Sequence, residues 1–334
     1  MTKVSLKTIA KELGVSTATV SLVLNGKDKN GRVSKNKAQL IRQKAEELNY
    51  MPNSIAKSLR VGNSKTLGLI VADITNVFFG SLAFHIQENA EKAGYAVIIG
   101  NTNEDINKMN KMVNLLMRRQ VDGFIITPTE GSEYIVQDIL SRDIPIVLVD
   151  RHFPDVQVNS VTINNHQISY EAVNSLIEKG CRKIGILVYY SDHQTHMYNR
   201  KRGYVQAVTE AGIYDEELVK EVRFETLEED IHNAINDLLA KQIDGLFFAT
   251  NSISMLGLRK IISKNDPKFS GINYMCFDEN DAYNLLPFKI PYIKQPIQKI
   301  AKKTIDQIIV QIKDGNDRQS IVENSVIKAE LILE

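Results

Sequence analysis

The sequence predicts an α/β chain that begins with a small all-helical unit and continues as two doubly wound lobes. Three observations lead to this prediction. The length of 334 residues suits two or three domains. Apolar residues recur at helical spacing before residue 50, and short apolar runs alternate with amphipathic segments after residue 65. This alternation indicates parallel sheets covered by helices on both faces.

Three apolar stripes define the amino-terminal unit. They are Leu6, Ile9, Ala10 and Leu13; then Val20, Val23 and Leu24; then Ala38, Ile41, Ala45 and Leu48. A serine precedes each stripe, and Ser5, Ser16 and Ser34 can each accept a hydrogen bond from the following turn. Gly14 permits a sharp turn between the first two helices. The pattern predicts a DNA-binding unit whose second helix, within residues 15–25, enters the major groove.

Charge supports this interpretation because it is unevenly distributed. Residues 1–65 hold 13 Lys or Arg and 4 Asp or Glu, a net charge of +9, whereas the rest of the chain holds 28 and 36, a net charge of −8. A basic run by itself is commonly a solvated face. Together with the capped helices and the Gly14 turn, it indicates a polyanionic partner for the amino-terminal unit.

Several other classes of protein find no support in the sequence. Cys181 and Cys276 stand alone, without the spacing of a metal site, and no apolar run approaches the roughly 20 residues that a bilayer needs. The amino terminus lacks the apolar core of a signal peptide. We find no GxGxxG or GxxxxGKS/T phosphate loop and no GxSxG elbow. We therefore expect a soluble, cytoplasmic, non-enzymatic protein without a cofactor or metal.

The two lobes are predicted from strands that alternate with helices. The first set comprises strands 67–71, 96–99, 123–126 and 145–149 with helices 80–93 and 108–119; the second begins near residue 161 and comprises helices 170–179, 202–211 and 228–240 with strands 183–188 and 245–248. Residues 119–125 (Arg-Gln-Val-Asp-Gly-Phe-Ile) and 241–247 (Lys-Gln-Ile-Asp-Gly-Leu-Phe) repeat one pattern. Ligands of such folds bind beyond the carboxyl ends of the strands, here between the lobes.

Five motifs, in this order and spacing, carry a resemblance over nearly the whole chain. They are residues 8–16 (Thr-Ile-Ala-Lys-Glu-Leu-Gly-Val-Ser) with Thr19-Val20-Ser21, 52–60 (Pro-Asn-Ser-Ile-Ala-Lys-Ser-Leu-Arg), 67–79 (Leu-Gly-Leu-Ile-Val-Ala-Asp-Ile-Thr-Asn-Val-Phe-Phe), 200–204 (Arg-Lys-Arg-Gly-Tyr) and Gln295-Pro296. The chain resembles the lactose-repressor (LacI/GalR) family of bacterial transcriptional regulators.

The resemblance implies a domain organisation and a function. It implies a helix-turn-helix DNA-binding domain over 1–50, a hinge helix and linker over 51–64, and two Rossmann-like lobes of the periplasmic-binding-protein type, with 65–162 plus 293–325 in one and 163–292 plus 326–334 in the other. It further implies a homodimeric repressor that binds a palindromic operator in double-stranded DNA. A small carbohydrate-like effector between the lobes would control operator affinity, with no membrane partner. A sugar-binding receptor module and a sugar-acting enzyme remain alternatives.

The same resemblance assigns DNA-binding roles. Thr17, Ala18 and Leu22 would face the bases, while Ser16, Thr19, Ser21 and Asn25 would make phosphate or register contacts. Four hinge residues, Ala56, Lys57, Leu59 and Arg60, would meet the minor groove, with Leu59 as an unstacking wedge. Leu22 departs from the family pattern, in which an Arg that can bind guanine is common. The alternatives are that Leu22 merely packs, and that Ile55 and Leu59 form the apolar face of a short helix packed on its own domain.

For the effector, the resemblance implies a polar grip and a cover for the sugar ring. Arg200 and Asp278 would supply the grip. The other implied contacts are Asp150, Asn251 and Gln295, the ring-covering Phe78, Phe79 and Phe224, and His196 in a polar aromatic cluster. Phe79 can alternatively face a dimer contact. Asn251-Ser252 and Asn164-Asn165 stand where the family commonly carries carboxylates, so the exact ligand of a relative does not transfer.

Overall fold

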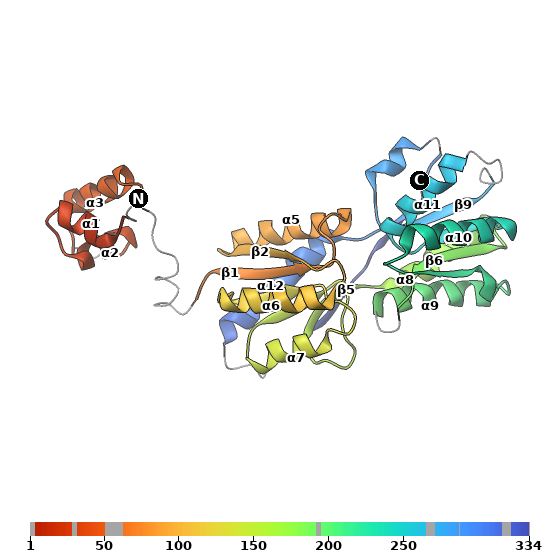
Figure 1. The fold of residues 1–334 in the computed structure, drawn as a ribbon, viewed down its shortest axis with the longest axis horizontal. Helices are drawn as coiled ribbons and strands as arrows, with labels where there is room; N and C mark the ends of the chain where they lie inside the picture. Colours follow the sequence, from red (N-terminus) through yellow and green to blue (C-terminus); the bar gives the residue numbers. More distant parts are fainter. Residues whose placement is uncertain are drawn as a thin grey trace. The chain divides into compact units, whose positions relative to one another are not determined.

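The computed structural model describes residues 4–28, 32–50, 63–191, 195–264, 271–286, 288–315 and 322–333 (Figure 1). The chain divides into two compact units, Met1–Ser64 and Lys65–Glu334. The predicted hinge contacts Ala56, Lys57, Leu59 and Arg60 lie outside the described residues.

The amino-terminal unit contains the three predicted helices. They are α1 (Leu6–Glu12), α2 (Thr17–Leu24) and α3 (Lys35–Glu47). Ser5, Ser16 and Ser34 each accept a hydrogen bond from a backbone N–H in the first turn, which confirms the three predicted caps. Gly14 has a φ of +61°, a conformation that suits glycine. The buried residues of the three stripes pack into one small core.

The first lobe is built on a parallel six-stranded sheet in the order β11-β5-β4-β3-β1-β2. Its strands are β1 (Thr66–Val71), β2 (Ala96–Asn101), β3 (Gly123–Ile126), β4 (Ile146–Val149), β5 (Asn159–Ile163) and β11 (Asn324–Ile327). Helices α5 (Val77–Lys92) and α12 (Ile297–Asp314) pack into one core, and α6 (Ile106–Arg118) and α7 (Glu133–Ser141) into another. The sheet is therefore covered on both faces, as the sequence predicts.

The second lobe repeats this plan with the order β12-β10-β9-β8-β6-β7. Its strands are β6 (Ile184–Tyr189), β7 (Val219–Val222), β8 (Gly245–Phe248), β9 (Asn273–Phe277), β10 (Tyr292–Lys294) and the antiparallel β12 (Glu330–Ile332). Its helices are α8 (Asn165–Glu178), α9 (Thr195–Glu210), α10 (Leu227–Ala240) and α11 (Asn251–Lys264), with 3-10 turns at Glu216–Leu218 and Asp281–Leu285. Three segments cross between the lobes: after β5, between β10 and α12, and between β11 and β12.

The sequence repeat at 119–125 and 241–247 performs the same structural task in each lobe. Gln120 and Gln242 adopt φ angles of +56° and +57° at the ends of their helices. Asp122 accepts a hydrogen bond from the backbone of Lys65, and Asp244 accepts one from that of Lys183, both at 2.8 Å. Each aspartate thus joins the start of the third strand to the start of the first.

Two helices begin a full turn or more earlier than the apolar pattern predicts. Helix α9 starts at Thr195 rather than 202, and α8 at Asn165 rather than 170. The additional turns keep helical spacing on their buried faces, but the buried residues there include polar ones, His196 and Arg200 on α9 and Asn165 on α8. Hydrophobic periodicity therefore misses those turns.

Among the residues that the structure describes, no helix is long and apolar enough to cross a membrane.

Candidate functional site

A cavity of about 670 Å³ opens where the carboxyl ends of the two sheets face each other within Lys65–Glu334. All nine residues that the sequence assigned to an effector contribute to its lining. They are Phe78, Phe79, Asp150, His196, Arg200, Phe224, Asn251, Asp278 and Gln295.

Asp150 and Asp278 occupy equivalent positions on opposite walls. Each directly follows a strand, β4 or β9, and each has a φ of +72°. This left-handed conformation is uncommon for a residue with a Cβ and costs of order 1–3 kcal/mol where it is strained. Both side chains are buried, and burial raises the pKa of each carboxyl group above its ordinary value. Such strained, desolvated carboxylates are typical of binding sites.

Arg200 is fixed rigidly in the second turn of α9. Its Nε donates to Asn165 Oδ1 at 2.8 Å and its Nη1 donates to the Ala249 carbonyl at 2.8 Å. The guanidinium carbon lies 3.5 Å from the centre of the Phe277 ring. Burial lowers the pKa of Arg200, while the nearby carboxylates of Asp278 and Asp150 oppose that shift. The guanidinium therefore presents its remaining N–H groups in a defined direction.

Gly203, in the Arg-x-x-Gly motif, allows this placement. A Cβ at Gly203 would collide with the His166 carbonyl and with Ser169 on α8. The absent side chain lets α9 approach α8 closely enough for Arg200 to reach Asn165. The glycine of the motif is thus explained by packing.

Asp278 and Asn251 are held by partners from neighbouring elements. Gln295 donates to Asp278 Oδ1 at 2.7 Å. Asn251, at the start of α11, exchanges two side-chain hydrogen bonds of 2.9 Å with Asn76, which caps α5 in the other lobe. This reciprocal amide pair joins the two lobes at the edge of the cavity.

Buried Arg151 and partly buried Glu104 form an ion pair in the cavity wall that was not predicted from the sequence. Arg151 Nη1 and Nη2 donate to the two carboxylate oxygens of Glu104 at 2.9 and 2.8 Å, and Nε donates to Asp150 at 3.4 Å. The available signal was the position of Arg151 directly after Asp150, at the end of a buried strand. Nothing in the sequence linked it to Glu104, which lies 47 residues earlier.

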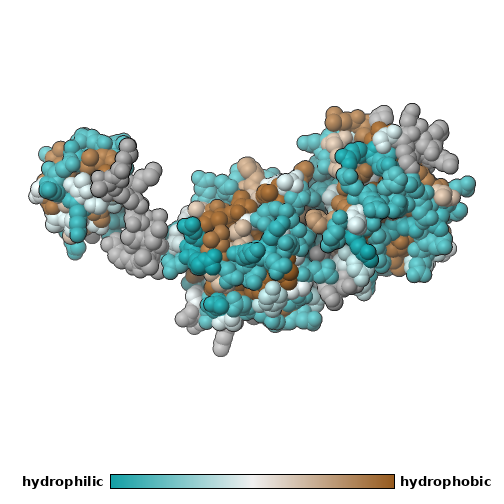
Figure 2. Space-filling view, in the orientation of Figure 1, coloured by the Kyte–Doolittle hydropathy of each residue, from teal (hydrophilic) through white to brown (hydrophobic). Residues whose placement is uncertain are grey.

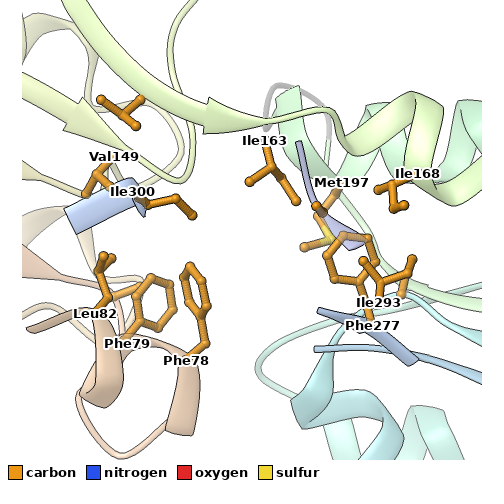
Figure 3. Close-up of a cluster of buried hydrophobic side chains, with 14 of the residues drawn as sticks. Phe78, Phe79, Leu82, Val149, Ile163, Ile168, Met197, Phe277, Ile293 and Ile300 are labelled. Carbon is orange, nitrogen blue, oxygen red and sulfur yellow. The ribbon is translucent and has the colours of Figure 1, made fainter. Parts of the chain in front are cut away.

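The aromatic residues divide between a buried and an open end of the cavity. Phe78 and Phe79 meet edge to face with ring centres 5.0 Å apart, and both are buried. Figure 3 shows them on one lobe, opposite Met197 and Phe277 of the other. Phe79 therefore lines the cavity rather than the outer surface. Phe224 is 46% exposed and lies 6.3 Å from the Tyr189 ring, at the open end.

His196 is buried, and it lies close enough to the buried Arg151 and Arg200 to interact with both charges. Burial lowers its pKa well below the ordinary value, and the charges of Arg151 and Arg200 add to that effect. Its Nδ1 has no hydrogen-bond partner within the part of the chain that the structure describes. A neutral imidazole with an unused nitrogen is suited to a hydrogen bond with a bound ligand.

The second helix of the amino-terminal unit presents most of its predicted DNA contacts to solvent. Ser16, Thr17, Ala18 and Asn25 are exposed, while Thr19, Ser21 and Leu22 are partly exposed. The Ser16 and Thr19 hydroxyls lie 2.8 Å apart, and Asn25 Nδ2 donates to the Ser21 carbonyl at 2.6 Å. Leu22 is not among the described apolar side chains that pack on the core of the unit.

Comparison with protein families gives matches to both units. Residues 5–53 match bacterial regulatory proteins of the lacI family. Residues 64–226 match the periplasmic binding proteins and sugar-binding domain of the LacI family, and residues 173–332 match a periplasmic binding protein-like domain.

Two relatives align over almost the full length of the chain. The HTH-type transcriptional regulator RegA of Clostridium saccharobutylicum is 30% identical over 331 residues, which is 98% of each chain. The ribose operon repressor of Haemophilus influenzae is 28% identical over 334 residues, again 98% of each.

Two solved structures share the fold. A lac repressor dimer bound to operator and an anti-inducer has a TM-score of 0.84 at 19% identity, covering 99% of this chain and 98% of the other. A complex of the transcriptional regulator CelR with cellobiose has a TM-score of 0.71 at 21% identity, with the same coverage. From its family matches and full-length relatives, the chain belongs to the lacI family of bacterial regulatory proteins, with a helix-turn-helix DNA-binding unit and a two-lobed ligand-binding unit.

Proposed function

We propose that this chain is a cytoplasmic, non-enzymatic, homodimeric repressor whose affinity for a palindromic operator is controlled by a small sugar or sugar derivative in the cleft. The observation that carries the proposal is the arrangement of Arg200 with Asp150 and Asp278 inside a buried cavity. Sugar hydroxyls both donate and accept hydrogen bonds, so they suit a guanidinium flanked by carboxylates. The cellobiose in the CelR complex shows that a relative of this fold holds a sugar.

The remaining cavity residues complete the proposed sugar site. Neutral His196 and the Asn251 amide can each serve a further hydroxyl, and Gln295 keeps the Asp278 carboxylate oriented. Phe78 and Phe79 at the buried end, with Phe224 at the open end, offer apolar surface for the C–H faces of a ring.

The proposed control of DNA binding follows from the two-lobed construction of the site. Its walls come from both lobes, and three chain segments cross between them. A ligand that contacts both walls favours whichever lobe arrangement completes its contacts. It changes operator affinity only by its differential affinity for the DNA-competent and incompetent arrangements. We assign residues 1–50 to the DNA-binding domain and 51–64 to the hinge. The lobe bounds predicted from the sequence shift by one or two residues, because β5 and β11 of the first lobe end at residues 163 and 327 and β10 keeps residues 292–294 in the second lobe.

A homodimer is supported by the difference between two equivalent edge strands. On β2 of the first lobe, Ile98 and Ile99 are 38% and 40% exposed, with Phe84 of α5 at 59%. Figure 2 shows apolar surface on this face of the lobe. The equivalent strand β7 carries Lys220 and Glu221, both in ion pairs. Charged residues protect an edge from association, so the apolar β2 edge is the one suited to a second copy.

The proposed DNA contacts follow from the exposed face of α2. We propose that Thr17, Ala18 and Leu22 meet the base edges, that Ser16, Thr19, Ser21 and Asn25 set the register on the phosphates, and that Ala56, Lys57, Leu59 and Arg60 bind the minor groove. Leu22 can offer only apolar contact, for example to a thymine methyl group. The operator should therefore differ at that position from one read by arginine.

The proposed function can be tested by selecting binding sites from random double-stranded DNA with the full chain and then titrating the selected fragment by gel shift. We expect a palindrome, strong salt dependence, and a change in affinity with a sugar that also raises the melting temperature. Substituting Leu22→Arg should move base preference toward guanine, whereas Thr226→Arg, a matched exposed position in the ligand-binding unit, should not. Sugar binding without any DNA selectivity would instead support a receptor module, and turnover of the sugar would support an enzyme.

A further inference from the structure

The charges that line the cleft do not balance. Among the residues that the structure describes, six acidic side chains line it, from Asp73, Glu104, Glu130, Asp150, Glu225 and Asp278, against three guanidiniums, from Arg151, Arg200 and Arg223. Even without Asp150 and Asp278, whose pKa values burial raises, four acids outnumber the three guanidiniums. His196 adds no positive charge because burial and two neighbouring arginines lower its pKa well below its ordinary value. An anionic ligand would therefore enter a field of its own sign, which low-dielectric walls strengthen.

Glu104 binds the guanidinium of Arg151, which could otherwise bind an anionic ligand. Arg151 donates to both Glu104 oxygens, at 2.9 and 2.8 Å, to the Pro128 carbonyl at 3.3 Å and to Asp150 at 3.4 Å. Its side chain is only 6% exposed. Paired bidentate contacts of this kind are among the strongest between side chains, so an entering phosphate or carboxylate would have to displace Glu104.

Arg200 keeps N–H groups for a ligand, but it does so between two carboxylates. Asp278 and Asp150 both interact electrostatically with its guanidinium. A hydroxyl can accept from Arg200 while donating to a carboxylate, so it satisfies both partners. An ionised phosphate or carboxylate can only accept, and it would leave Asp150 and Asp278 facing a third negative charge.

We propose that Glu104 is a specificity-determining residue. Because Glu104 pairs with the Arg151 guanidinium, the cleft selects uncharged polyhydroxylated ligands and rejects phosphorylated and carboxylated sugars. This inference rests on the proposed function, because it takes the ligand of the cleft to be a sugar. The effector class is then the uncharged sugars, and the ion pair between Arg151 and Glu104 determines it.

The first test uses the wild-type full chain with matched probes in thermal unfolding at constant ionic strength. Glucose, galactose and ribose are each compared with a terminal phosphate ester, and glucose and galactose also with their uronic acids. We expect saturable stabilisation only by uncharged members. A phosphate ester or uronate that stabilises the wild type more than its uncharged parent, and loses this effect with Arg151→Gln, overturns the proposal. Failure of all uncharged sugars counts against the sugar effector itself, and the second test then decides the role of Glu104.

The second test uses inorganic sulfate, so it does not depend on sugar stereochemistry. Glu104→Gln frees Arg151 while keeping the shape of the side chain. We expect calorimetry to show saturable sulfate binding at least about tenfold tighter than in the wild type, and the added Arg151→Gln to abolish the gain. Glu225→Gln is the matched control, since it removes one carboxylate from the exposed end of the same cleft. A cooperatively folded Glu104→Gln chain without this gain, or an equal gain in the control, overturns the proposal.

Discussion

Strands β4 and β9 end at equivalent points of two sheets with the same strand order, and an aspartate with a φ of +72° follows each. On the first wall of the cavity, Asp150 lies beside Arg151, whose guanidinium already forms an ion pair with Glu104. On the second wall, Asp278 is held by Gln295 and lies near Arg200, which keeps N–H groups for a ligand. The shared backbone thus determines the positions of the two carboxylates. Their neighbours determine that the arginine of one wall is already paired, whereas the arginine of the other wall can bind a ligand.

The edges of the two sheets differ in the same manner. β2 and β7 both lie next to the first strand of their lobe, yet β2 exposes Ile98 and Ile99 whereas β7 carries Lys220 and Glu221. The difference teaches that equivalent elements of a duplicated fold can be assigned to separate tasks through side chains alone.

The largest expected effect comes from removing the guanidinium of Arg200, which keeps N–H groups for a ligand. Arg200→Ala removes the positive charge that faces the buried Asp278, a loss of about 3–5 kcal/mol in interactions of this type. We expect the effector to lose its effect on operator binding, measured by gel shift with and without ligand. Arg259→Ala is the control, because Arg259 is an exposed arginine of the same lobe. An unchanged effector response would contradict the assignment of Arg200.

The next effect should be loss of the dimer from one edge only. Ile99→Glu places a charge at the exposed apolar edge strand β2. Association would desolvate this unpaired charge, which strongly opposes it. We expect sedimentation equilibrium to show a shift toward monomer and weaker operator binding. Val326→Glu, at an exposed site on the opposite edge strand β11 of the same sheet, should leave the dimer intact. Dimers of equal strength in both variants would place the interface elsewhere.

A third prediction concerns pH, where His196 and the two aspartates act in opposite directions. The pKa of His196 is lowered by folding, so its contribution to stability is present above its unfolded pKa of about 6.5 and is lost as pH falls below it. The pKa values of Asp150 and Asp278 are raised, so their burial weakens stability as pH rises through those values.

The measurement is urea unfolding between about pH 7 and 5, with a maximal slope near 1.4 kcal/mol per pH unit for one proton. His196→Gln should flatten the loss of stability toward low pH. His232→Gln, on α10 at a partly exposed site, is the matched control. Identical pH profiles for His196→Gln and the wild type would show that His196 is not held neutral by the fold.

The smallest effect should come from the amide pair that joins the two walls. Asn76→Ala removes two hydrogen bonds to Asn251, worth about 1–2 kcal/mol together. We expect a shift of up to about tenfold in effector affinity, measured by calorimetry, because the pair favours the lobe arrangement that it bridges. Asn114→Ala removes amide bonds confined to α6 and should leave affinity unchanged. Equal affinities in the two variants would show that the pair does not bias the lobes.

Much of this organisation was predictable because it is local. The helices of the amino-terminal unit follow from serine caps, the turn at Gly14 and apolar spacing. The nine proposed effector residues, which line one cavity, were implied instead by the family resemblance. The starts of α8 and α9 were misplaced because their first buried residues include polar ones. The pairing of Arg151 with Glu104 was not predicted, since a contact across 47 residues leaves no periodic signal.

By itself the sequence determined the family, the order of helices and strands, the position of the basic amino-terminal unit and the residue types at the strand ends. Those properties depend on backbone propensity, capping and charge, which act within a few residues. Tertiary structure alone decided that Glu104 pairs with Arg151, that Arg200 donates to Asn165 and to the Ala249 carbonyl, and that β2 rather than β7 exposes apolar surface. Charge compensation and burial depend on which distant side chains meet, so only the packed fold defines them.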